Sequence, residues 1–212
     1  MTASASLRLP TFHLVLLCLV LGVLAWSGTA PRDRFTWLLE VAPVLLALPL
    51  LAFTARRFPL TPLAYVLIAV HAVILMVGGH YTYAEVPLFD TLRESYGWAR
   101  NHYDRVGHFA QGFIPALVAR EILLRASPLR PGRWLFFLVI CFCLAFSAFY
   151  ELIEWWVALA SGEGATAFLG TQGDVWDTQW DMFLALLGAV SSQLLFARWH
   201  DRQLMPLLKA SR

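Results

Sequence analysis

Two glutamates, Glu151 and Glu154, lie inside an apolar run that extends from about residue 134 to 158. The run is long enough to cross a membrane, and the sequence around the two acids is FYELIEWWV. A carboxylate in the hydrocarbon core of a bilayer is unstable unless it is paired, protonated or bound to a cation. Because the two acids are three residues apart, a helix places them on one face. The pattern therefore predicts a polar site within the membrane.

Other ionisable side chains belong to the same predicted depth. Asp104 and His108 lie where the next apolar segment upstream begins, and Asp177 and Asp181 lie where the last apolar segment begins. Both pairs have i, i+4 spacing, which places each pair on one helix face. We therefore expect three helices to bring carboxylates and a histidine to one level of a bundle.

This combination of donors is typical of a metal site, because bundles build such sites from inward-facing Glu and His on neighbouring helices. Carboxylate oxygen and imidazole nitrogen together suit Zn, Mn or Fe, whereas Mg or Ca suits them less well. The predicted metal ligands are Asp104, His108, Glu151, Glu154, Asp177 and Asp181. A bound metal would activate a coordinated water. Without metal, either glutamate or the histidine would serve as general acid or base.

Four further side chains are predicted to bind a substrate at this level. Arg100 and Arg105 precede and open the segment that carries His108, and arginine suits an anionic head group. His80 and Tyr83 follow the apolar segment that ends near residue 79.

Each assignment has a structural alternative. Asp104 and Asp177 could be N-caps of their helices. His108 could be a core histidine that is satisfied by hydrogen bonds. No capping role requires Glu151 and Glu154 in the middle of a helix, and their alternative is an ion pair with Arg100 or Arg105.

The elements that must position these residues are membrane-spanning helices. The chain has 212 residues, is 59% hydrophobic and has a mean hydropathy of +0.63, whereas roughly 45–50% is usual in soluble domains. Spans in lipid must satisfy their own backbone hydrogen bonds, and the alternation of barrel strands is absent. We predict one all-α domain over residues 1–212, a polytopic membrane bundle with six transmembrane helices. The helices are expected at about 11–27, 37–54, 62–79, 106–124, 134–158 and 181–199.

The distribution of charge predicts the orientation. With a cytoplasmic N-terminus, the inner side carries more Lys and Arg than the outer side, so both termini should be cytoplasmic. Of the 14 Asp and Glu residues, only Glu121 and Asp201 fall on the inner side. The inner basic residues are Arg8, Arg56, Arg57, Arg120, Arg125, Arg130, Arg133, Arg198, Arg202, Lys209 and Arg212. Residues 11–27 could also be a signal peptide, but Pro31 follows the expected cleavage point and disfavours cutting.

Long motifs between residues 80 and 182 resemble the YjdF-like bacterial inner-membrane proteins. These motifs are HYTYAEVPLFD, NHYDRVGHFAQGFIPALVAREILLR, YELIEWW and LGTQGDVWDTQWDM. The spacing of Asp104 and His108, followed by helical acids, is also similar, more loosely, to VanZ-like membrane proteins. The first resemblance implies a multi-pass protein of the bacterial inner membrane with no known function, and it carries over no catalytic residue.

Three functions fit these observations. The first is a metal-dependent hydrolase or transferase that acts at the outer face on a lipid or lipid-linked substrate. The second is a transporter of a cation or small solute, in which the same carboxylates would form a polar path. The third is a non-catalytic accessory protein whose polar cluster only stabilises the bundle. A net charge of +2 gives no case for nucleic-acid binding, and the oligomeric state is left open.

Overall fold

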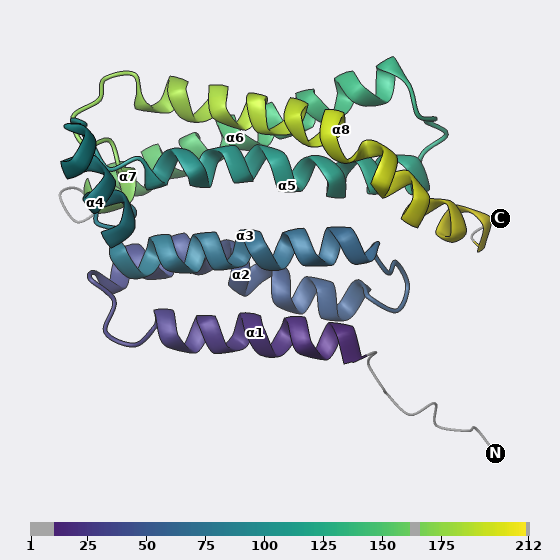
Figure 1. The fold of residues 1–212 in the computed structure, drawn as a ribbon, viewed down its shortest axis with the longest axis horizontal. Coiled ribbons are helices and arrows are strands. Elements are labelled where there is room, and N and C mark those ends of the chain that lie inside the picture. Colours follow the sequence, from purple (N-terminus) through teal and green to yellow (C-terminus); the bar gives the residue numbers. More distant parts are fainter. Residues whose placement is uncertain (1–10, 162–165, 211–212) are drawn as a thin grey trace.

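Two groups of three long helices lie side by side, with two short helices at one end (Figure 1). The computed structural model describes residues 11–161 and 166–210, and every regular element in these ranges is a helix. Arg8 and Arg212, which entered the charge comparison, lie outside the described residues, as does the side chain of Lys209. The all-α prediction is therefore confirmed for the part of the chain that the structure describes.

The first group contains α1 (Thr11–Ser27), α2 (Arg34–Thr54) and α3 (Pro62–Tyr81). Asp33 caps α2 by accepting a hydrogen bond from the backbone N–H of Thr36 at 2.6 Å. Thr61 caps α3, and Pro62 occupies the first helical position, where its missing N–H costs nothing. Their shared core consists of small and branched apolar side chains, namely Val20, Val41, Val44, Ala69, Ala72 and Met76.

The second group contains α5 (Tyr103–Ala126), α6 (Arg133–Ser161) and α8 (Asp177–Ala210). All three pack against one another, and α5 also packs on α3 and so joins the two groups. The apolar core of this group is Ala116, Leu124, Leu135, Val139, Cys143, Ala189 and Leu204. The short helices α4 (Pro87–Tyr96) and α7 (Thr166–Leu169) lie at the end where α5 and α8 begin (Figure 1).

Two glycines bring α5 and α8 into backbone contact. A Cβ atom on Gly112 would lie 1.8 Å from the carbonyl oxygen of Ala185, and one on Gly188 would lie 2.2 Å from that of Phe109. Only a residue without a side chain fits at either place. Small residues allow membrane helices to approach in this way, and this seam sets the distance between the polar side chains one turn away.

Within the described ranges, four helices are long and apolar enough to cross a membrane, namely α2, α3, α6 and the stretch Asp177–Leu208 of α8. Helix α1 is apolar but has only 17 residues. Helix α5 has 24 residues, carries charges at both ends and is largely enclosed by its neighbours. Large apolar side chains such as Leu46, Phe53 and Leu194 are exposed on the outside of the bundle, as expected where the solvent is lipid.

Candidate functional site

The predicted polar site exists as a buried cluster where α5 and α8 begin and α6 approaches its end. Helix geometry places Asp104 and His108 on one face of α5, and Glu151 and Glu154 on one face of α6. Asp181 lies one turn into α8 and is only 2% exposed. The structure therefore brings together side chains that are far apart in the sequence.

His108 is the centre of this cluster. Its Nε2 atom lies 3.4 Å from Asp104 Oδ1 and 3.8 Å from Asp181 Oδ2. Its Nδ1 atom lies 3.0 Å from the side-chain oxygen of Gln111 and 3.8 Å from Glu151 Oε1. The two ring nitrogens thus face two different sets of oxygen atoms.

Two groups of three residues could each hold a metal ion. The first is Asp104, His108 and Asp181, and the second is His108, Glu151 and Glu154; within each group the donor atoms lie within 4.8 Å of one another. Glu151 Oε1 and Asp181 Oδ1 are buried and accept no hydrogen bond from any described residue. Buried polar atoms nearly always have a partner, so these two oxygens indicate a missing ligand or proton.

Arg100 binds aspartates at the edge of the cluster. Its guanidinium donates to Asp177, lies 3.4 Å from Asp104 Oδ2 and 3.5 Å from Asp174 Oδ2, and donates to the carbonyl of Gly170. Burial disfavours the charged form of Arg100, but the hydrogen bond to Asp177 and the negative charges of Asp177, Asp104 and Asp181 together outweigh burial and raise the pKa of Arg100. Arg100 therefore holds one oxygen of Asp104 while the other faces His108.

Two of the structural alternatives, namely the N-cap role of Asp104 and the ion pairs of Glu151 and Glu154, do not agree with this arrangement. The residue that precedes α5 is His102, which makes no capping hydrogen bond, and Asp104 lies inside the first turn. Arg105 pairs with Asp174 at 3.1 Å and lies over the ring of Trp180. In the described ranges, neither Glu151 nor Glu154 pairs with an arginine, so that interpretation is wrong.

Two predicted substrate-binding residues have other contacts. His80 Nδ1 lies 2.9 Å from the carbonyl oxygen of Ser27, and its ring packs on Trp26, so it faces α1. The ring of Tyr83 is buried between α3 and α5, where Gly78 and Gly107 leave space for it. The structure thus brings neither side chain into contact with the carboxylates.

Two residues near the cluster were missed. Gln111 is three residues after His108, so its i, i+3 spacing could have placed it on the same face. Glu40 on α2 is buried and interacts electrostatically with Asp104 and His108. An acid within an apolar helix was the available indication for Glu40, but only packing reveals which helices it faces.

A second polar network lies at the opposite end of the bundle. Glu121 is fully buried and accepts hydrogen bonds from the N–H and hydroxyl of Thr61, from Arg125 and from His200. Arg120 donates to His200 Nδ1 at 3.0 Å, so the proton of this imidazole is on Nε2, facing Glu121. Glu121 and His200 thus contact each other at the end of the bundle away from His108, and both are fully buried.

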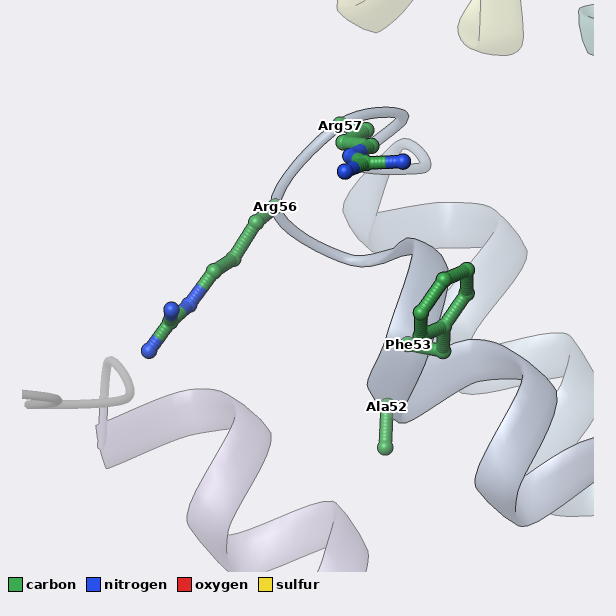
Figure 2. A pocket seen from close by; sticks show the side chains of 4 residues that line it. All are labelled: Ala52, Phe53, Arg56 and Arg57. Atoms are coloured by element: carbon green, nitrogen blue, oxygen red, sulfur yellow. The ribbon is translucent and has the colours of Figure 1, made fainter.

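Two hollows of about 360 Å³ each lie away from the carboxylates. One is lined by Ala52, Phe53, Arg56 and Arg57, and Figure 2 shows Arg56 extending away from the helix that carries Phe53. The other is lined by Arg120, Gly132, Arg133, Leu135, Phe136, Gln193 and Ala197. Neither of these two hollows includes a residue of the His108 cluster.

Comparison with known proteins agrees with the resemblance seen in the sequence. A family model described as "Predicted membrane protein (DUF2238)" matches residues 12–202. The protein named "Inner membrane protein YjdF" from Escherichia coli (strain K12) is 58% identical over 182 residues, which cover 86% of this chain and 87% of that protein. No solved structure matches the chain. The match to the family model includes the first two helices, for which no motif had been recognised.

Proposed function

The chain belongs to the DUF2238 family of predicted membrane proteins, and we propose that it binds a divalent transition-metal cation in the His108 cluster. The observation that carries this proposal is the convergence of His108 with carboxylates from three helices, two of which have buried oxygens without a hydrogen-bond partner. Apolar surroundings make such uncompensated charge expensive. A cation is the simplest ligand that satisfies both oxygens.

The donor geometry supports a cation on the Nε2 side of His108. Two ligands at about 2.1 Å from a tetrahedral ion are roughly 3.4 Å apart, and the distances from Nε2 to Asp104 and Asp181 are 3.4 and 3.8 Å. Gln111 accepts from Nδ1–H, and a ligating imidazole generally donates its other N–H to such a partner. Zn, Mn or Fe suits this mixed set of donors.

The proposed topology has six spans and cytoplasmic termini. Helices α1 and α5 are added to the four long apolar helices as the remaining two spans, because α1 is apolar and α5 lies between the other spans. Helix α1 begins and α8 ends at the same end of the bundle as the turn that carries Arg56 and Arg57 (Figure 1). Positive residues favour the cytoplasmic side, so the metal lies toward the outer leaflet. The name of the E. coli relative supports the inner membrane as the location.

The proposed activity is a metal-assisted hydrolysis or group transfer on a lipid or lipid-linked substrate. A bound metal would supply a Lewis acid and an activated water. Trp155, Trp156 and Trp180 are exposed near the end of the bundle that holds the cluster, and tryptophan prefers the head-group region. An anionic head group would therefore lie within reach of the site.

The packing gives no specific support to the transport hypothesis. Below the His108 cluster, the second helix group is filled by Ala116, Val139, Cys143 and Ala189. These side chains are almost entirely buried, and they separate the cluster from the network around Glu121. In the described ranges, the buried polar side chains of α6 and α8 between the two networks, such as Ser147 and Ser192, are uncharged.

Metal analysis of purified protein in nanodiscs tests the proposed cation. After incubation with ZnCl₂ and desalting, the wild-type protein should retain zinc, and His108→Ala and Asp104→Asn should retain at least tenfold less. Asp201→Asn, at the opposite end of the bundle, serves as the matched control and should retain the wild-type amount. Wild-type protein without zinc, manganese or iron would refute the proposal.

The enzymatic part needs its own experiment. Metal-loaded protein is incubated with total lipid extract from a bacterial membrane, and the products are compared by mass spectrometry. A lipid product that appears with wild-type protein but not with His108→Ala would support the reaction class. Binding of metal without any metal-dependent product would leave a cation-binding protein and remove the enzyme.

A further inference from the structure

A single cation does not balance the buried charge of the cluster. Arg100 pairs with Asp177, which leaves, apart from Glu40 on α2, four buried carboxylates around His108, namely Asp104, Asp181, Glu151 and Glu154. One divalent cation next to His108 Nε2 balances two of these four. The two that remain lie on α6, and in the described ranges neither pairs with a cationic side chain apart from His108, which is 3.8 Å from Glu151.

The oxygens on this side of His108 form a second donor set. Glu151 Oε1 is buried without a hydrogen-bond donor, and one ligand atom each from His108, Glu151 and Glu154 lie within 4.8 Å of one another. Gln111 Oε1 lies 3.0 Å from His108 Nδ1, the ring nitrogen that also faces Glu151. Two carboxylates and an amide oxygen suit a hard cation such as Mn²⁺ or Mg²⁺.

We propose that the cluster holds two divalent cations on opposite sides of the His108 ring. The first occupies the position described above, at Nε2 between Asp104 and Asp181. The second is bound by Glu151 and Glu154 with the side-chain oxygen of Gln111. This proposal rests on the proposed function, because the second position extends the same site.

Both positions use side chains of α5, but their other carboxylates come from different helices. Asp181 enters from α8 across the seam with α5, whereas both glutamates belong to α6. Loss of a glutamate should therefore empty the second position and leave the first. Because the two positions flank one imidazole ring, the cations are close to each other, and this separation is measurable without any variant.

Titration with MnCl₂, followed by electron paramagnetic resonance, tests the pair. Wild-type protein in nanodiscs should bind two Mn²⁺ per chain, and the bound ions should show the broadened spectrum of magnetically coupled manganese. Glu154→Gln should bind one Mn²⁺ with an uncoupled six-line spectrum, because the second Kd rises at least tenfold. Glu94→Gln, a change at an exposed acid, is the matched control and should still bind two.

The possible outcomes separate this proposal from the preceding one. One Mn²⁺ per wild-type chain would overturn the second position and leave the proposed function intact, whereas no bound Mn²⁺ together with no zinc would refute both. Two uncoupled ions, or two coupled ions that persist in Glu154→Gln, would also overturn the assignment. If Glu154→Gln does not fold, the wild-type stoichiometry and spectrum decide the question alone.

Discussion

The contact between Gly112 and Ala185 allows a quantitative prediction. Gly112 lies one turn after His108, and Ala185 lies one turn after Asp181, so this contact fixes the distance between the two polar side chains. In Gly112→Ala, the new Cβ would lie 1.8 Å from the Ala185 carbonyl oxygen, whereas real Cβ atoms essentially never approach closer than 3.0 Å. The two helices must therefore separate locally by about 1.2 Å, the difference between these distances.

The expected energetic effect has two opposing parts. Overpacking of this kind costs about 1–3 kcal/mol, while replacing glycine by alanine inside a helix gains up to about 1 kcal/mol. The separation of about 1.2 Å between α5 and α8 removes roughly half of the dispersion energy along their contact. The destabilising part should therefore be larger than the gain in helix propensity. We expect a net destabilisation of about 1–2 kcal/mol, which corresponds to a fall in Tm of about 2–8 °C for a chain of this size.

Thermal unfolding in detergent micelles, measured together with zinc retention, tests this reasoning. Gly22→Ala is the matched control, because a Cβ at Gly22 meets nothing within 4 Å, and it should unfold at the wild-type temperature or slightly above. Gly112→Ala should also retain less zinc, since separation of the helices moves Asp181 away from His108. If Gly112→Ala unfolds no earlier than Gly22→Ala and retains zinc fully, the seam does not position the cluster.

Three other changes test contacts elsewhere in the chain. Asp33→Ala should lower the free energy of unfolding by about 1 kcal/mol at pH 7, because it removes the N-cap of α2, whereas Asp33→Asn should retain most of it. Hydrogen bonds from the first turn lower the pKa of Asp33 below its ordinary value of 3.8. The stability that the charged cap adds is therefore present above pH 3.8 and is lost as the pH falls through the lower pKa of the folded state. Melting curves from pH 3 to 7 check this, and melting temperatures of wild type and Asp33→Asn that do not converge in acid would contradict it. Gln172→Ala should speed amide hydrogen exchange at residues 170–176, because Gln172 exchanges two hydrogen bonds of 2.9 Å with the backbone of Asn101; unchanged exchange would show that these bonds do not hold the loop. Glu121→Gln should destabilise the fold by about 3 kcal/mol, since it leaves the guanidinium of Arg125 without its carboxylate and weakens the hydrogen bond from His200. The exposed Glu94→Gln should unfold like wild type, and equal melting temperatures for the two variants would count against the network.

The sequence determined the parts of this protein that depend on local periodicity. Apolar stretches of about 20 residues predicted the six long helices with ends within a few residues of those observed, except for the C-terminal extension of α8. Spacings of three and four residues also placed the ionisable side chains on the correct faces, because the period of a helix is fixed by its backbone. The polar helix α4 was not predicted, since its residues lack an apolar run of that length.

Tertiary structure alone decided which of those faces meet. His108 contacts acids from α6 and α8 because Gly112 and Gly188 let the backbones approach, and no local pattern states which helix fills that space. Packing likewise directed Arg100 to Asp177 rather than to the glutamates, and it buried His200 beside Glu121. A helix specifies the direction of its own side chains, whereas their partners depend on contacts between segments that are distant in the chain.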